Sequence, residues 1–387
     1  MPRILFLDHA GVLGGAELSL LTIARHYAGS GRVILFADGP FRERLERDGL
    51  AVEILRAPES VSGARRGGGG LHQMLAFPGV VQMAREIALR AKNFDVLLAN
   101  SQKALVVGAL ASKMAGKPLI WCLRDILTAD HFSGFNRKAV VFLANRFANR
   151  IVANSQATLA AFVASGGRTQ RTRVVYNGID IPPDPTREIA TAAREIRNNL
   201  GWDGAKVVGL FSRLAPWKGQ HVLLEALPKV PELYALFVGA PLFGDEVLYQ
   251  QELEAKAASL GLGDRVRFLG FREDIPALLE AVDFVAHTSV APEPFGRVIV
   301  EGMLAGKPVI ATRAGGACEI IEDGITGRLV TPGDADALAK ALRALIEQPN
   351  EAARLARAGR ASAHERFSVK AMLLGIEQAV AEAMEGR

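Results

Sequence analysis

Short apolar runs alternate with longer helical patterns along all 387 residues of the chain, and this alternation constrains the fold more than any other feature. Strands that alternate with helices are typical of parallel sheets covered by helices on both faces. In the first half the expected strands are Ile4–Leu7, Val33–Ala37, Val52–Leu55, Val96–Asn100, Leu119–Cys122, Ile151–Asn154 and Arg173–Val175. In the second half they are Lys206–Phe211, Leu233–Val238, Val266–Leu269, Phe284–His287, Val309–Ala311 and Arg328–Val330. We therefore expect an α/β protein with two doubly wound sheets.

A turn- and proline-rich stretch, Tyr176–Pro185, separates the two sets of strands and has the composition of a domain linker. We expect an N-terminal Rossmann-like domain over residues 1–180 and a second one over residues 181–366. Ligands of open α/β sheets bind at the carboxyl ends of the strands. Two such domains would therefore face a central cleft, and the cleft would be the binding site.

Composition excludes several classes of protein. No uncharged apolar run approaches the roughly 18–20 residues of a membrane span. The first residues enter a strand rather than a signal peptide, and two cysteines make no disulfide framework. Aromatic residues are only 6% of the chain and no nucleic-acid motif is present, so no nucleic-acid partner is expected. We expect a cytoplasmic protein.

Charge is unevenly distributed. Residues 1–184 carry 23 Lys and Arg against 14 Asp and Glu, a balance of +9, while the remainder carries 23 against 27, a balance of −4. The excess includes Arg65 and Arg66 in the glycine-rich stretch Ser62–Leu71, which we expect to be a loop, either an acceptor-side flap or an inert insertion. It also includes Arg137, Lys138, Arg146 and Arg150 in or beside one helical stretch. This half indicates an anionic partner, such as the inner face of a membrane or a lipid-linked acceptor, although an ordinary solvated basic surface is an equal alternative.

Two glutamates flank an expected helix start in Glu293-Pro-Phe-Gly-Arg-Val-Ile-Val-Glu301. The Pro-Phe-Gly break places Glu293 on a loop and Glu301 about two turns into the helix. The helix N-terminus at Gly296, Arg297 and Val298 offers free N–H groups to a phosphate. An anion site between two carboxylates that can bind hydroxyls is what a pocket for a nucleoside-diphosphate sugar requires. The alternative interpretation is that both glutamates are ordinary solvated charges of a helix.

Three further segments follow expected strands and could approach a diphosphate. Gly11–Glu17 contains Gly14 and Gly15 but is no regular Gly-x-Gly-x-x-Gly, and Asp38 keeps a dehydrogenase as an alternative. Phe211–Gly219 places Arg213 and Lys218 on one loop, where both cations could neutralise a leaving diphosphate or form an exposed charge cluster. Thr312–Glu319 is a glycine turn that enters a helix.

Taken in order along the chain, the motifs are Gly-Gly-Ala-Glu, Asn177-Gly-Ile-Asp180, Ser-Arg-Leu with Lys-Gly, Glu-Pro-Phe-Gly with its second Glu, and Gly-Gly-x-x-Glu-Ile-Ile-Glu-Asp-Gly. This series resembles the retaining glycosyltransferases of family 4, which have the GT-B fold. The resemblance implies that Arg213 and Lys218 bind the donor diphosphate and that Glu301 binds the ribose. It implies that Glu293 lies by the donor sugar, whose hydroxyls the backbone at Phe295 and Gly296 would hold. It also implies the donor base near Arg267, Leu269 and Gly270, a phosphate contact from Gly15, and a helix over residues 367–387 that crosses back onto the first domain.

One position departs from the family pattern. The family often has His-Asp after the fifth N-terminal strand, where this chain has Arg124-Asp125. Arginine cannot act as a base but can hold a phosphate or a hydroxyl, and His131 is an alternative substitute for the missing histidine. Retaining enzymes of this type are thought to let the leaving phosphate take the acceptor proton, so no nucleophile–base pair is required.

With this resemblance, the sequence indicates a retaining, metal-independent glycosyltransferase without a cofactor, which moves a hexose-type sugar from a nucleotide donor to a hydroxyl acceptor in glycan or glycolipid assembly. A GT-B epimerase or phosphorylase and a non-catalytic sugar-nucleotide sensor are the alternatives. Asp334-Ala-Asp336 is expected to cap a helix rather than bind a metal. His287 is expected to be a packed residue at a strand end, with a position lining the cleft as the alternative.

Overall fold

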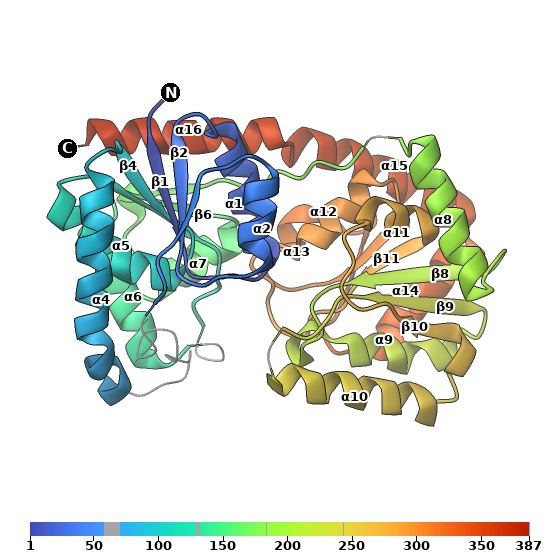
Figure 1. Cartoon of the computed structure of the whole chain (residues 1–387). Coiled ribbons are helices and arrows are strands. Elements are labelled where there is room, and N and C mark those ends of the chain that lie inside the picture. The colour runs from blue at the N-terminus through green and yellow to red at the C-terminus, as the bar shows by residue number, and fades with distance from the viewer. Residues whose placement is uncertain (58–69, 129–131, 183, 243, 387) are drawn as a thin grey trace. The chain divides into compact units, whose positions relative to one another are not determined.

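The computed structural model describes residues 1–57, 70–128, 132–182, 184–242 and 244–386. It divides into two compact units (Figure 1). Unit 1 contains Met1–Gly178 together with Val369–Arg387, and unit 2 contains Ile179–Ser368. Among the described residues, no helix has both the length and the apolar character that crossing a bilayer requires.

Unit 1 is built on a parallel sheet with the order β3-β2-β1-β4-β5-β6-β7. Its strands are β1 (Ile4–Asp8), β2 (Gly31–Leu35), β3 (Val52–Ile54), β4 (Val96–Ala99), β5 (Leu119–Leu123), β6 (Arg150–Ala153) and β7 (Thr172–Val174). Alternate residues of β1 lie in two different hydrophobic cores. Leu5 and Leu7 belong to one core, and Ile4 and Phe6 belong to the other. The near-continuous apolar strands of the sequence are explained by this burial on both faces.

Helices cover both faces of this sheet. The core around Leu5 is completed by α4 (Gly70–Ala91), α5 (Gln102–Ala115), α6 (Gly134–Phe147) and α7 (Gln156–Ala164), which precedes the short helix η1 (Thr169–Arg171). The core around Phe6 is completed by α1 (Gly15–His26), α2 (Pro40–Arg47) and α16 (Val369–Glu385). Arg150 and Arg173 both form ion pairs with Glu382 of α16. The last helix is therefore part of unit 1 through both packing and charge.

Unit 2 has a parallel sheet with the order β10-β9-β8-β11-β12-β13. Its strands are β8 (Lys206–Phe211), β9 (Leu233–Val238), β10 (Val266–Phe268), β11 (Phe284–His287), β12 (Val309–Thr312) and β13 (Arg328–Val330). Its helices are α8 (Arg187–Leu200), η2 (Pro216–Lys218), α9 (Gln220–Ala226), η3 (Leu227–Lys229), α10 (Gly244–Ser259), η4 (Gly263–Arg265), α11 (Ile275–Ala281), α12 (Arg297–Leu304), α13 (Ala317–Ile320), α14 (Ala335–Glu347) and α15 (Pro349–Arg366).

The prediction of two Rossmann-like domains is confirmed. In each sheet the strand order reverses once, between β1 and β4 in unit 1 and between β8 and β11 in unit 2. Ligands of such sheets bind outside the carboxyl ends of the strands at this reversal. The helix-capping interpretation of Asp334 is also confirmed, since its side chain accepts a hydrogen bond from Ala337 N at the start of α14.

Candidate functional site

The loops that follow β8 and β11 bring Lys218 and Glu293 together at the strand reversal of unit 2. Lys218 Nζ lies 2.6 Å from Glu293 Oε2. The two loops are joined by hydrogen bonds, from Thr288 Oγ1 to the Lys218 carbonyl at 3.0 Å and from Val290 N to the Trp217 carbonyl at 2.9 Å. Gly219 permits this approach, because at its φ of +68° a Cβ would lie 2.0 Å from the Thr288 carbonyl oxygen.

Two further side chains, from the last residue of β11 and from the loop just after it, also contact Glu293 Oε2. Ser289 Oγ donates to it at 3.1 Å, and His287 Nε2 lies 3.4 Å away. His287 Nδ1 is buried and has no hydrogen-bond partner among the described residues, so we place the imidazole proton on Nε2, facing Glu293. Burial alone would raise the pKa of Glu293, but the charge of Lys218 and the contact with His287 outweigh it and hold that pKa well below its usual range.

The glycine turn after β12 supports the backbone of Glu293. Gly316 N donates to the Glu293 carbonyl at 2.8 Å. Gly315 has a φ of +59°, and a Cβ there would lie 2.2 Å from the same carbonyl oxygen. The Thr312–Glu319 segment, predicted as a diphosphate neighbour, thus has a direct role in fixing the loop that carries Glu293.

Arg213 is held by a carboxylate that the sequence did not single out. Its Nε lies 3.2 Å from Oε1 of Glu246, a buried residue of α10. Trp217 lies beside both cations of this loop, with its ring centroid 5.9 Å from the Arg213 guanidinium carbon and 4.2 Å from Lys218 Nζ. Each predicted diphosphate-binding cation therefore has an acidic partner and shares one indole ring.

Helix α12 begins next to this cluster. Gly296 precedes it with a φ of +104°, and Phe295 is buried against Phe367 at 5.7 Å between ring centroids. Glu301 lies in the second turn, as predicted, and forms an ion pair with Arg297 at 3.3 Å. Val298, in the first turn, is partly exposed.

Only part of the predicted base-binding segment reaches the carboxyl edge of the sheet. Leu269 follows β10 and donates its N–H to the Phe237 carbonyl, and Gly270 accepts from Gly239. The guanidinium of Arg267 points to the amino end of β10, where it donates to the Gly263 carbonyl at 2.8 Å and lies 5.9 Å from the Trp202 ring. The structure thus places Leu269, but not the Arg267 side chain, at this edge.

Unit 1 carries a polar network at its own strand reversal. Asn100, after β4, donates to Asp8 Oδ2 at 2.6 Å and accepts from Arg124 Nε at 2.6 Å. Arg124 Nη1 donates to Asn177 Oδ1 at 2.8 Å, while Asp125 accepts from Gln102 at 3.2 Å. Arg124 is thus fixed by side chains that follow β4 and β7, and the alternative residue His131 lies outside the described residues.

Gly14 and Gly15 form the start of α1, where a buried carboxyl lies close to the backbone. Glu17 Oε2 is so near Gly14 that a Cβ on that glycine would lie 2.7 Å from it. Burial, and after it the charge of Asp8, raise the pKa of Glu17 to about 7. The helix start at which we predict an anion-binding position therefore lies next to the Glu17 carboxyl, whose pKa is near neutral.

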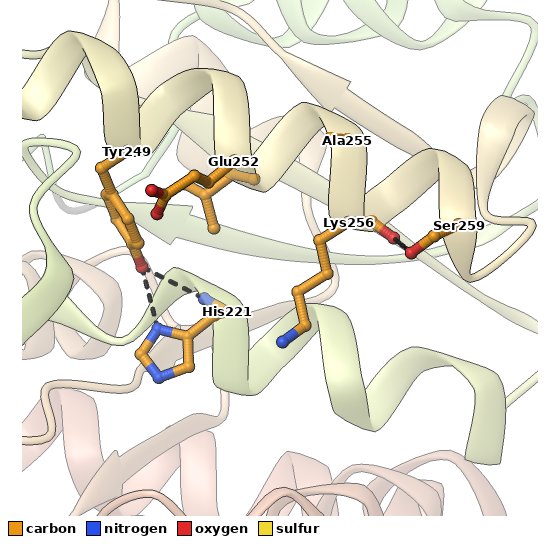
Figure 2. A pocket seen from close by; sticks show the side chains of 7 residues that line it. His221, Tyr249, Glu252, Ala255, Lys256 and Ser259 are labelled. Carbon is orange, nitrogen blue, oxygen red and sulfur yellow. Dashed lines mark hydrogen bonds between the residues drawn. The ribbon is translucent and has the colours of Figure 1, made fainter.

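A separate hollow lies between α9 and α10 (Figure 2). His221 Nδ1 lies 2.9 Å from the Tyr249 hydroxyl, and Lys256 lines the hollow further along α10. Burial lowers the pKa of His221 and raises that of Tyr249 to about 12. None of the predicted site residues lines this hollow.

Comparisons with known proteins cover both units. Residues 13–181 match the family model described as Glycosyltransferase Family 4, and residues 192–362 match that described as Glycosyl transferases group 1. A crystal structure of HepE from Anabaena in complex with UDP and glucose has 46% identity and a TM-score of 0.89, and the alignment covers 98% of this chain and 100% of HepE.

Curated relatives match over different lengths. The 2-deoxystreptamine glucosyltransferase of Streptomyces kanamyceticus is 29% identical over 91% of this chain and 95% of that enzyme. Spore coat protein SA of Bacillus subtilis is 36% identical, but the match spans 41% of this chain and less than half, 45%, of that protein.

Proposed function

Because the chain belongs to glycosyltransferase family 4 and has the GT-B fold of two Rossmann-like domains, we propose that it transfers a hexose from a nucleoside-diphosphate sugar to a hydroxyl acceptor with retention of configuration. The observation that carries the proposal is the Lys218–Glu293 pair at the strand reversal of unit 2. Its support is the 46% identity over the whole length to HepE, whose crystals hold UDP and glucose. A uridine nucleotide and glucose are therefore the first donor to test.

The two cations would neutralise the diphosphate as it leaves. A lysine ammonium has three N–H donors, so Lys218 can keep Glu293 and still bind a phosphate oxygen. The guanidinium of Arg213 has five donors and suits bidentate contact with phosphate. The N–H groups at the start of α12 add a partial positive charge for the same anion.

Glu293 would act on the sugar. Its negative charge, fixed by Lys218, Ser289 and His287, would stabilise the positive charge that develops at the anomeric carbon. In the proposed step the bond between the anomeric carbon and the phosphate oxygen breaks, and the acceptor oxygen bonds to that carbon on the same face. The acceptor proton passes to the leaving phosphate oxygen, which balances the reaction.

The remaining predicted residues would bind and orient the substrates. We assign Glu301 to the ribose hydroxyls, the backbone at Phe295 and Gly296 to the sugar, and Leu269 to the base. In unit 1 we assign Gly15 to the phosphate and Arg124 with Asp125 to the acceptor. No metal is needed in this scheme, since Arg213, Lys218 and the helix start supply the neutralising charge.

The proposal is tested by incubating the protein with UDP-glucose in the presence and absence of hydroxyl acceptors and analysing the products by NMR. We expect an α-linked product from this α-configured donor, formed only with an acceptor. Donor conversion to an epimer without an acceptor would identify an epimerase instead. Tight donor binding without turnover across acceptors and nucleotide sugars would identify a sensor.

A further inference from the structure

One face of α6 presents two phenylalanines and two cations to solvent. Phe135 is 57% exposed and Phe142 is 64% exposed, and Lys138 and Arg146 are exposed as well. At 100° per residue these four positions fall within an arc of about 80°. We call Phe135, Lys138, Phe142 and Arg146 the α6 stripe. Large apolar side chains in a contiguous exposed stripe, rather than scattered singly, indicate an interaction surface.

The opposite face of α6 already fixes the helix in unit 1. Val140, Val141 and Ala144 are buried in the core that contains Leu5. Helix α6 also packs against α5 (Figure 1). The stripe is therefore not required to hold the helix in place, and its phenylalanines remain available for a partner.

The chain around the stripe has only one sign of charge. From residue 131 to residue 179 there is no Asp or Glu, whereas Lys and Arg occur at Arg137, Lys138, Arg146, Arg150, Arg168, Arg171 and Arg173. Arg150 and Arg173 are used by Glu382, which removes Arg150 from the cations that the sequence had suggested for an anionic partner. For Lys138 and Arg146 the described residues supply no ion-pair partner.

A third cation lies near the C-terminal half of the stripe. The backbone N–H of Arg168 donates to Asn145 Oδ1 at 2.9 Å, and Asn145 Nδ2 donates to the Gly166 carbonyl at 2.9 Å. These bonds fix the loop of Arg168 next to the residue that precedes Arg146. The side chain of Arg168 is exposed.

We propose that the α6 stripe docks this protein onto the surface of an anionic lipid bilayer. Phenylalanine side chains enter the boundary between headgroups and acyl chains, while Lys and Arg bind the lipid phosphates from the same face. A second copy of the chain does not suit this face, because a symmetric contact would bring the unpaired cations of both copies together. The sequence-based candidates Arg65 and Arg66 lie outside the described residues, so the proposal rests on α6 alone and is independent of the donor chemistry.

The test is co-sedimentation of the full chain with vesicles of phosphatidylcholine alone and of phosphatidylcholine with phosphatidylglycerol, at low and high salt. We expect binding only to the anionic vesicles, weakened by salt. The double variant Lys138→Glu/Arg146→Glu should lower the partition coefficient at least about 25-fold, since each cation near an anionic membrane contributes about fivefold. The double variant Phe135→Ser/Phe142→Ser should lower it at least about tenfold.

Control variants carry changes of the same kind on unit 2. Lys340→Glu/Arg357→Glu alters net charge equally, and Leu248→Ser removes an exposed apolar side chain of α10. Both controls should bind vesicles like the wild type, and every variant should keep the wild-type melting temperature and donor binding. A wild type that ignores anionic vesicles at low salt overturns the proposal, as do stripe variants that bind like the wild type. Concentration-dependent dimers that the Phe135→Ser/Phe142→Ser variant abolishes would also overturn it, in favour of self-association.

Discussion

Glu293 in unit 2, whose side chain is 13% exposed, and the buried Glu17 in unit 1 both lie near the strand reversal of their sheet, yet their surroundings shift their pKa in opposite directions. Burial is the largest influence on each, and it raises both pKa values. Glu293 has Lys218 at 2.6 Å and His287 at 3.4 Å, which together outweigh burial, whereas Glu17 faces the carboxylate of Asp8 and reaches a pKa of about 7. The groups in contact with such a carboxyl therefore decide whether it is a fixed charge or a group that titrates near neutral pH.

The largest expected effect comes from removing the Lys218 cation. Lys218→Met leaves Glu293, whose side chain is largely buried, beside no ammonium group, so we expect a loss of about 3–5 kcal/mol in the free energy of unfolding. Urea denaturation followed by circular dichroism measures it. Lys229→Met is the matched control, because Lys229 pairs with the exposed Asp336 and should contribute less than about 1 kcal/mol. Equal losses in both variants would contradict the role given to Lys218.

Next in size is the separation of the two glutamates around α12. Glu293→Gln should lower kcat by about 10²–10³, because its charge is needed most in the transition state. Glu301→Gln should mainly raise KM for the donor, since a ribose contact is shared by ground and transition states. Steady-state kinetics with UDP-glucose as the first donor check both. If both variants change KM alone, the assignment of Glu293 to the sugar is wrong.

Glu17 should reveal itself through the pH dependence of stability. Its folded pKa of about 7 is raised above the unfolded value, so its contribution is fully present below about pH 4.5 and is lost as the pH rises through about 7. Glu17→Gln removes this titration. The stability of the variant relative to the wild type should therefore increase between pH 5 and pH 8 by roughly 2–3 kcal/mol. Urea denaturation at both pH values measures the change, and a pH-independent difference would show that Glu17 is charged throughout.

A smaller effect is expected for the residue that orients Glu293. His287→Gln should lower kcat about tenfold without changing KM for the donor. A tenfold loss corresponds to the free energy of one hydrogen bond to a charged group. Combined with Glu293→Gln it should cost little more, because the two residues then act as one unit. His221→Gln, in the hollow of Figure 2, should leave kcat unchanged. Additive losses in the double variant would assign His287 a purely structural role.

The smallest effect is expected from removing metal ions. The neutralising cations of unit 2 are covalently part of the chain, so initial rates should be unchanged in excess EDTA. Among the described residues, no group of three or more His, Cys, Asp and Glu side chains is placed to hold a metal ion. Loss of activity in EDTA that manganese restores would show that Arg213 and Lys218 are insufficient.

The strands were predictable because burial on both sheet faces leaves uninterrupted apolar runs. Expected and observed strands coincide at Lys206–Phe211 and Phe284–His287. The second strand begins earlier than expected, at Gly31, because its first two residues are not buried and carry no apolar side chain. The order of motifs likewise gave the fold family. The apolar runs and the order of motifs can both be identified from the sequence alone, because neither depends on contacts between distant residues.

The partners inside the site were less predictable. Glu246, which holds Arg213, comes from a polar helix with no distinguishing pattern, and Asn100 and Asn177 reach Arg124 from distant strand ends. His287 was expected to be a packed residue and is one, but its contact with Glu293 depends on how the loop after β11 turns back. The sequence identifies groups that can carry chemistry, while their neighbours follow from tertiary packing.

The place of α16 in unit 1 has a consequence for biosynthesis. Met372, Ile376, Ala379 and Val380 complete a core whose other members include Ile4 and Phe6, and all of unit 2 is synthesised between them. Domains usually fold in the order in which they leave the ribosome. Here the first unit to be translated lacks part of its sheet cover until the end of translation, so unit 2 can reach its final fold first. A premature stop codon before Val369 would consequently destabilise unit 1, although the deletion lies at the other end of the chain, because it would expose apolar surface on β4, β5 and β6.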